Sequence, residues 1–561
     1  MSSPIQKQFV ELIQLLTLGK FKEAFDLLEK ISKMKGLSKE DQLNCLLLKS
    51  EVEYYMGNFK KSLKLAEKAL KESRELDNTV LIIKSLFRVS AAVYFFGDIN
   101  KSLGLIEKSL KLMTDENLFE DSALTRIRIR LIGSKGVILA NAGNYKIGLE
   151  KIQQAIKMAE KADEKRILTF LTTHFGLYTL FAGNTAKAEK ILKRAYKFAL
   201  DLGNKQEIAL ATMRMGVLKT QKLEHKEALE LYFKSLEIME ETGSTYLHFG
   251  TYMNIGIVYN ALFQFDEAIK YMKKALTYET GFSFMIHTNL AEVYYWKNEL
   301  DLALEYYLDA LKKSIEIKDR RYHPIILYSL VNIHVQKKQF KEAQQYLDQL
   351  EKIRDEEKLK QYDELHKFAS IQFYKASTNI QDWSKAVMFA EKFISGEDVY
   401  VEWRVDALYS ILEIRLRELQ INANEESLTQ VRKQIDEVFR EAEEKQQYNM
   451  IVNLYRLKAQ LALVELDVKK AVDMLITART IAIEKDLELL VQGITEEQKK
   501  LEEQISMWTK FQEQNLPLVD TLKQVSLENT VQEIAKDAIV EVRDEDSGKV
   551  IEYRKLFALK I

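Results

Sequence analysis

Proline is nearly absent from this chain, and glycine is scarce. Only 3 prolines and 20 glycines are found among its 561 residues. Proline breaks helices and marks loops, so its scarcity leaves little room for a many-stranded β architecture. No uninterrupted apolar run of about 18 residues occurs either, so a membrane-spanning helix is not expected. The one cysteine, Cys45, excludes an intrachain disulfide and favours a reducing compartment, the cytoplasm.

An excess of charge of either sign is also lacking. Lysine and arginine number 83 against 84 aspartates and glutamates, a net charge of -1. No overall field therefore favours nucleic acid or an anionic membrane, and neither is expected as a partner. Hydrophobic residues make up 47% of the chain and charged residues 30%, the usage of an ordinary globular protein. These proportions predict a globular chain with a large core, and the scarcity of proline and glycine predicts that it is mostly helical.

The chain contains a recurring sequence motif. In it, a turn residue, an apolar residue and a charged pair precede a small residue near the start of an amphipathic helix. Examples are GKFKEA, GNFKKS, GNYKIG and FQFDEA. The small residue stands at Ala24, Ser62, Ser102, Gly148, Ala188, Ala228, Ala268, Ala303, Ala343, Ala386 and Ala471. Most intervals are close to 40 residues, but the last is about twice as long. A degenerate repeat is therefore expected near residues 400–445.

A second small residue recurs seven positions later, on the same face of the helix. It stands at Ala69, Ser109, Ala155, Ala195, Ser235, Ala275, Ala310 and Ala478. Two small side chains two turns apart on one face predict close contact with another helix. Twelve positions before the first small residue, units such as Ile255–Tyr259 and Leu290–Tyr294 carry Gly256 and Ala291, which mark the other helix of each pair.

This pattern resembles the tetratricopeptide repeat, in a longer variant of about 40 residues. The clearest copies are TYMNIGIVYNALFQFDEAIKYMKKAL and HTNLAEVYYWKNELDLALEYYLDAL. The resemblance covers roughly residues 5–485, although no repeat keeps the family's proline after its second helix. It implies an all-α fold: a right-handed α-solenoid, or superhelix, of about twelve helix-turn-helix repeats. Similar long variants occur in spindle-orientation scaffolds, kinesin light chains and bacterial peptide-sensing regulators.

Three segments follow from these patterns. Residues 1–485 form the repeat array, 486–515 one long helix and 516–561 a C-terminal tail. The long helix has apolar residues at 4,3 spacing, so it either caps the last repeat, the favoured interpretation, or forms a coiled-coil homodimer. In the tail, two alternating runs flank residues 544–548 and predict a small β-hairpin, which could also mediate a homodimer. The acidic DEDSG turn superficially resembles a calcium loop, but Lys555 replaces the glutamate that such a loop needs.

The chain contains none of the common local catalytic motifs. Nothing matches GxxxxGK[ST], a GxGxxG after a strand, GxSxG or HExxH. Its seven histidines fall in different repeats without the spacing of metal ligands. We therefore expect no enzyme activity, no catalytic residue, no cofactor and no metal.

Candidate binding residues come from the first helix of each pair, because in a tetratricopeptide solenoid these helices line the concave surface. Asparagine can pair with both polar groups of a bound peptide backbone, arginine can hold a carboxylate, and aromatic faces can cover side chains. The predicted groove residues are Arg88, Arg130, Arg214, Asn254, Asn289, Asn332, Tyr295 and Trp296.

The favoured function is a non-enzymatic scaffold that binds extended segments of partner proteins or peptides in this groove. One alternative is a peptide-responsive regulator whose solenoid changes pitch when the ligand binds. Another is an accessory subunit of an enzyme. The sequence does not identify the partner.

Overall fold

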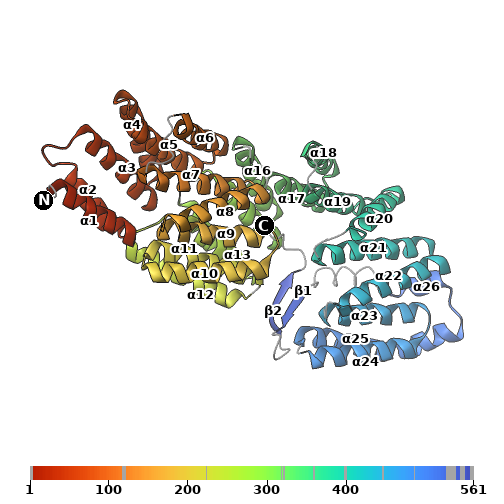
Figure 1. Cartoon of the computed structure of the whole chain (residues 1–561). Coiled ribbons are helices and arrows are strands. Elements are labelled where there is room, and N and C mark those ends of the chain that lie inside the picture. Colours follow the sequence, from red (N-terminus) through yellow and green to blue (C-terminus); the bar gives the residue numbers. More distant parts are fainter. Residues whose placement is uncertain are drawn as a thin grey trace. The chain divides into compact units, whose positions relative to one another are not determined.

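A computed structural model of the chain shows helices in consecutive packed pairs, as the repeat predicted (Figure 1). It describes residues 4–115, 122–222, 224–278, 280–317, 319, 322–357, 360–396, 401–444, 448–485, 487–525, 539–543 and 550–555. The chain divides into two units, residues 1–326 and residues 327–561, which we call the N-terminal and the C-terminal unit. In neither unit does a described helix combine the length and the apolar character needed to cross a bilayer.

Among the described residues, sixteen helices lie wholly within the N-terminal unit. They are α1 (Pro4–Leu18), α2 (Phe21–Ile31), α3 (Lys39–Tyr55), α4 (Phe59–Glu75), α5 (Thr79–Phe95), α6 (Ile99–Asp115), α7 (Ser122–Asn141), α8 (Tyr145–Lys161), α9 (Lys165–Phe181), α10 (Thr185–Leu202), α11 (Lys205–Lys222), α12 (His225–Thr242), α13 (His248–Ala261), α14 (Phe265–Leu276), α15 (Ser283–Trp296) and α16 (Leu300–Glu316).

The boundary between the units falls within α17 (Tyr322–Gln336). The remaining elements are α18 (Phe340–Glu357), α19 (Lys360–Lys375), α20 (Ile380–Ile394), α21 (Val401–Asn422), α22 (Glu425–Glu444), α23 (Tyr448–Val464), α24 (Val468–Glu484), α25 (Glu488–Glu513), α26 (Leu518–Lys523), β1 (Ile539–Arg543) and β2 (Val550–Lys555). The pair α21 and α22 occupies the region of the degenerate repeat.

Small residues hold the two helices of each pair together. Every small residue that marks the start of a second helix, from Ala24 to Ala471, is buried. In the second pair, the Ser50 and Ser62 hydroxyls each donate to the other residue's carbonyl oxygen, at 2.8 and 2.7 Å. In a later pair, a Cβ added to Gly256 would lie only 2.6 Å from Cγ of Met272. The small residues that lie twelve positions apart in the sequence are thus the ones that meet in the close contact within a pair.

The N-terminal unit winds until its chain meets itself. The hydroxyl of Ser244 donates to the carbonyl oxygen of Tyr55 at 2.8 Å, and that of Thr245 donates to the Met56 carbonyl oxygen at 2.8 Å. Likewise, the hydroxyl of Thr280 donates to the Phe95 carbonyl oxygen at 3.0 Å. The partners are 189 and 185 residues apart. We call this line of contacts the seam, and it also includes the hydrogen bond from Asn204 to the carbonyl oxygen of Thr17.

The seam indicates how far the superhelix advances along its axis in one turn. About 187 residues separate the seam partners, which corresponds to between four and five repeats. A displacement of one helical turn, about 5.4 Å, for each repeat would add up to about 25 Å over that distance, the length of a 17-residue helix such as α4. The C-terminal ends of early helices therefore rest against the turns of later ones.

In the C-terminal unit, the long helix α25 packs against its own chain. Its buried residues Ile494, Leu501 and Trp508 join a core cluster with residues of α23 and α24. The short helix α26 is fastened by the Thr521 hydroxyl, which donates to the Val464 carbonyl oxygen at 3.0 Å. The packing of α25 agrees with a capping helix, whereas a homodimer stays a prediction, as do the three segment boundaries.

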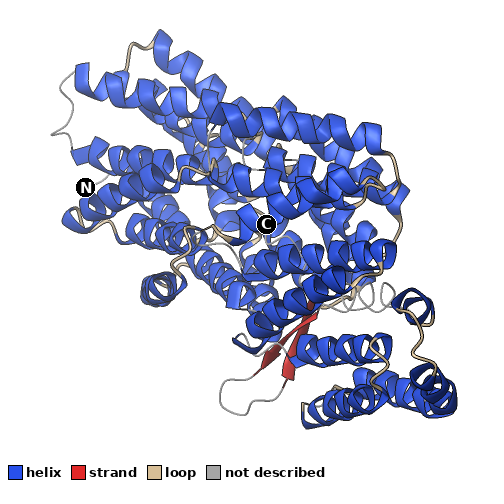
Figure 2. Cartoon of the chain, turned by 90° about the vertical axis from the view of Figure 1, so that its right-hand side faces the viewer, coloured by secondary structure: helices blue, strands red, loops and turns tan. Residues whose placement is uncertain are grey.

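Strands β1 and β2 pair antiparallel, with Ile539 opposite Lys555 (Figure 2). The DEDSG turn at 544–548 lies outside the described residues.

Candidate functional site

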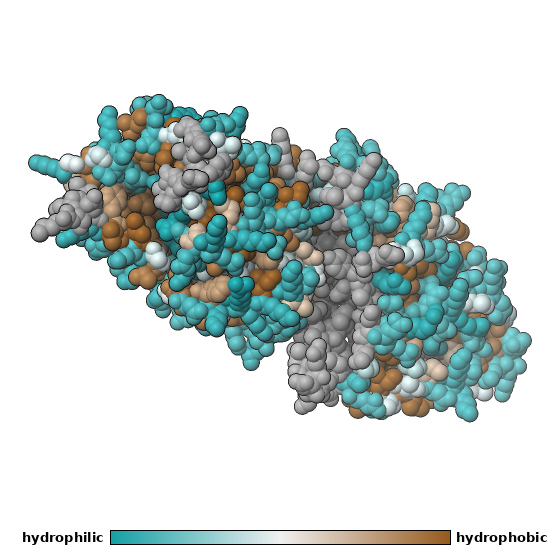
Figure 3. All heavy atoms as spheres, in the orientation of Figure 1, coloured by the Kyte–Doolittle hydropathy of each residue, from teal (hydrophilic) through white to brown (hydrophobic). Residues whose placement is uncertain are grey.

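The first helices of successive pairs in the N-terminal unit, which we call the inner helices, are α3, α5, α7, α9, α11, α13 and α15. Each contacts the next inner helix in the series. By contrast, the face shown in Figure 3 is mostly hydrophilic, and its apolar residues occur in small groups. The polar side chains of the inner helices are therefore the candidates for a functional site.

Glu51 on α3 gathers two of the predicted groove arginines. Its carboxylate oxygens lie 3.7 Å from an Nη1 atom of Arg88 on α5 and 3.7 Å from the Nη1 atom of Arg130 on α7. Glu51 is 9% exposed. Burial by itself would raise its pKa, but the charges of the surrounding arginines outweigh burial and hold the pKa at about 2. Glu51 is therefore ionised at neutral pH.

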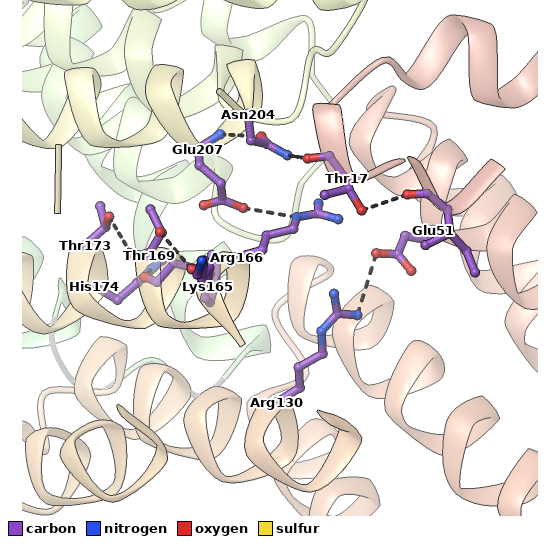
Figure 4. A network of polar contacts seen from close by, with 12 residues as sticks. Thr17, Glu51, Arg130, Lys165, Arg166, Thr169, Thr173, His174, Asn204 and Glu207 are labelled. Carbon is purple, nitrogen blue, oxygen red and sulfur yellow. Dashed lines mark hydrogen bonds and ion pairs between the residues drawn. The ribbon is translucent and has the colours of Figure 1, made fainter. Parts of the chain in front are cut away.

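A second ion pair lies beside the first, across the seam. Arg166 on α9 points its Nε atom at the carboxylate of Glu207 on α11, at 3.5 Å (Figure 4). The same guanidinium lies 5.7 Å from the ring centre of Tyr55 on α3. Burial raises the pKa of Glu207 above its usual value, although Arg166 acts in the opposite direction. We call Arg88, Arg130, Arg166, Glu51 and Glu207 the arginine cluster.

Arg214 on α11 is half-buried among aromatic rings. Its charge interacts with Tyr178, Tyr232 and Tyr246, and its buried Nε atom has no hydrogen-bond acceptor within the described parts of the chain. Burial, together with the charge of Arg214, lowers the pKa of His174 to about 3. His174 is therefore neutral at pH 7, and Arg214 is a half-buried cation beside neutral groups.

The predicted residues of α13 and α15 form a different, mostly uncharged region. Asn254 on α13 is half-buried. Asn289 on α15 is 3% exposed, and its Nδ2 donor finds no acceptor among the described residues. On the same helix, Trp296 donates from Nε1 to a carboxyl oxygen of Glu292 at 3.4 Å, and Tyr295 meets Trp296 edge to face at 5.4 Å. Burial raises the pKa of Glu292 to about 7.

Asn332 lies on the part of α17 that belongs to the C-terminal unit. Its Oδ1 atom is buried and has no donor partner in the described chain. The structure thus joins Arg88 and Arg130 through Glu51, and it groups Asn289 with Trp296 on one helix. Whether any of these residues binds a peptide stays a prediction.

Glu292 gives a pH-dependent prediction. Its folded-state pKa lies above the unfolded value, so the unfolded chain releases this proton first and stability falls as pH rises from about 4.5 to about 7. Glu292→Gln should therefore raise the free energy of unfolding at pH 8 by about 2–3 kcal/mol and change it little at pH 4.5. Urea unfolding followed by circular dichroism at the two pH values measures this. Glu305→Gln, at an exposed site on α16, is the control, and an equal effect of Glu292→Gln at both pH values would refute the assignment.

Sequence reasoning missed Glu51, Arg166 and Glu207, the residues that complete the arginine cluster. The signal was present in their positions. Counted back from the small residue of their own repeat, Glu51, Arg88, Arg130 and Arg166 stand 11, 14, 18 and 22 residues earlier. The cluster therefore moves by three or four residues, one helical turn, at each repeat. An alignment at equal positions could not bring these residues together.

Neither a metal site nor a free reactive thiol accompanies the cluster. Among the described residues, no three His, Cys, Asp or Glu side chains are grouped so that they could hold a metal ion. Cys45 is buried, and burial raises the pKa of its thiol to about 11.

Comparison with known proteins identifies the repeat. Residues 207–278, which contain α12, α13 and α14, match the family model described as tetratricopeptide repeat. No match was found among curated protein sequences.

Several solved structures are similar in part. A Rap protein complexed with competence and sporulation factor matches with a TM-score of 0.47 and 12% identity, over 63% of this chain and 99% of that one. The apo form of the quorum sensor NprR from B. thuringiensis has a TM-score of 0.41 and 13% identity, over 62% and 98%. Yeast Tom70 has a TM-score of 0.35 and 14% identity, over 88% and 99%. At scores below 0.5, none of these likenesses bears on what this chain binds.

Proposed function

We propose that this chain, which carries tetratricopeptide repeats, is a non-enzymatic cytoplasmic scaffold that binds an extended peptide segment of a partner protein along inner helices α11, α13 and α15. Arg214, Asn254 and Asn289 are the residues assigned to the peptide. All three stand 14 residues before the small residue of their repeat, so they occupy equivalent places on successive inner helices. Such a row suits a ligand that crosses one helix after another.

The observation that carries this proposal is the unpaired donor of Asn289. Its Nδ2 atom is buried without an acceptor in the described chain, and so is the Nε atom of Arg214 two inner helices earlier. A buried polar group without a partner costs about 1–3 kcal/mol. Peptide carbonyl oxygens would supply acceptors for both donors. Neighbouring packed helices lie about 10 Å apart, the length of about three extended residues, so one peptide could reach all three positions.

The test is a double substitution. Asn254→Ala combined with Asn289→Ala removes hydrogen bonds to the peptide backbone, each worth about 0.5–1.5 kcal/mol net. Affinity for peptides recovered by the full chain from an unbiased library should therefore fall about tenfold or more. Fluorescence polarisation measures the affinity, and circular dichroism verifies that helix content is unchanged.

Asn100→Ala provides the matched control, because Asn100 is exposed on α6, a second helix. This variant should bind the recovered peptides as the wild type does. The proposed function is wrong if the double variant binds every recovered peptide with wild-type affinity, or if Asn100→Ala weakens binding equally.

A further inference from the structure

The charges of the arginine cluster do not balance. Its three arginines, Arg88, Arg130 and Arg166, accompany only two carboxylates, Glu51 and Glu207. The other buried carboxylate nearby, Glu53, already pairs with Lys61 on the adjoining helix α4. Guanidinium groups stay protonated in proteins, so the cluster carries a surplus of one positive charge. Desolvating an unpaired charge is costly, so an anionic ligand would stabilise the cluster.

The arginines also have donors to spare. Arg88 is 9% exposed, yet its Nε and Nη2 atoms have no hydrogen-bond acceptor in the described chain. The Nη2 atom of Arg166 is equally buried and unpaired. The ion pairs to Glu51 and Glu207 measure 3.5–3.7 Å, longer than the 2.7–2.9 Å of a charge-assisted hydrogen bond. The carboxylates present therefore do not satisfy these guanidinium groups.

Each of two guanidinium groups lies over an aromatic ring, and the ring supplies no hydrogen-bond acceptor to its N–H groups. The guanidinium of Arg88 lies 5.8 Å from the ring centre of Tyr54, and that of Arg166 lies 5.7 Å from the ring centre of Tyr55. A ring attracts a cation but accepts no in-plane hydrogen bond from a guanidinium stacked on it. The unpaired N–H groups of Arg88 on α5 and Arg166 on α9 therefore gain no hydrogen-bond acceptor from these rings.

We propose that the arginine cluster binds an oxyanion of phosphate type, either free or carried as a phosphate group by a larger ligand. Its negative charge would offset the surplus of the cluster, and its oxygens, more numerous than the two of a carboxylate, could accept from donors on separate guanidinium groups. These oxygens would accept from Arg88 Nε and Nη2 and from Arg166 Nη2. This site is separate from the row on α11, α13 and α15 that the peptide proposal uses, because none of the arginines of the cluster belongs to that row.

Calorimetric titration of the full chain with inorganic phosphate at constant ionic strength tests the proposal. Saturable binding is expected for phosphate and sulfate, but not for acetate. Arg88→Gln should weaken phosphate binding about tenfold or more, as expected for the loss of one charged contact. Arg194→Gln should leave phosphate binding unchanged, because it alters an exposed ion pair with Glu160 between α10 and α8, the second helices of their pairs.

Glu51→Gln provides the test that a purely structural role would not pass. It removes a carboxylate that competes for the same arginines, so phosphate affinity should rise severalfold. This variant also decides the matter if Arg88→Gln does not fold. Unchanged or weaker phosphate binding by Glu51→Gln would overturn the proposal.

A phosphoserine peptide and its unphosphorylated counterpart distinguish the two sources of the oxyanion. Binding of free phosphate supports a small ligand, and binding of the phosphoserine peptide alone supports a carried group. The proposal is overturned if neither phosphate nor the phosphoserine peptide binds, or if the unphosphorylated peptide binds as tightly as the phosphorylated one. None of these results depends on Asn254 or Asn289, so this inference and the proposed function can fail separately.

Discussion

Replacing Gly57 with alanine is expected to lower the free energy of unfolding of the N-terminal unit by about 3 kcal/mol or more. Two costs combine at this position. Gly57 has a φ of +80°, a left-handed conformation that costs a residue with a side chain about 1 kcal/mol. In addition, the new Cβ would lie 2.0 Å from Oγ1 of Thr245, so the seam would have to shift. Urea unfolding followed by circular dichroism measures the loss.

Gly183→Ala separates the two costs. Gly183 follows α9 as Gly57 follows α3, and its φ is +87°, but a Cβ there would meet no atom within 4 Å. Its substitution should therefore cost only the backbone term of about 1 kcal/mol. Equal losses in the two variants would show that the seam contributes nothing at Gly57.

Arg166→Leu is expected to lower the free energy of unfolding by about 3–5 kcal/mol. It would leave Glu207, which is 3% exposed, buried without the cation that faces it. Breaking a buried ion pair from one side has this cost because the remaining charge keeps its desolvation penalty. Thermal and urea unfolding at pH 7 measure the effect.

A second substitution tests that explanation. Adding Glu207→Leu to Arg166→Leu removes both charges and should recover most of the loss, because apolar pairs often replace buried ion pairs at little cost. Arg194→Leu breaks the exposed pair with Glu160 and should cost at most about 1 kcal/mol. If the double variant is no more stable than Arg166→Leu, the loss came from packing rather than from the unpaired charge.

Most of the helical architecture could be predicted from single residues. Ala228 and Ala268 stand 40 residues apart and are both fully buried, because a helix pair needs a small side chain where its backbones approach. The departures from the pattern share its burial but not its small side chains. Leu350 and Phe393 replace the second small residue, and both are buried as well. Periodic packing between neighbours in sequence leaves a periodic signal.

The candidate site left no comparable signal, because it depends on contacts between distant repeats. Arg166 meets Tyr55, three repeats earlier, because the chain curves back in its superhelical turn. The pitch of that turn results from many small rotations between repeats, none of which is encoded by one residue type. For the same reason, Arg88 was predicted for an open groove, and the sequence did not show that Glu51 would face it.

The seam also changes how the N-terminal unit should fold. In an ordinary solenoid each repeat contacts only its neighbours, so folding can begin anywhere and the array can unravel from either end. Here hydrogen bonds join residues 185–189 positions apart, so the first repeats lose contacts when the fifth and sixth are missing. Closing so long a loop is slow, which places the seam among the last contacts to form. During synthesis on the ribosome, the first two repeats would therefore lack their seam contacts, and the surfaces that form them would stay uncovered, until about residue 246 has emerged.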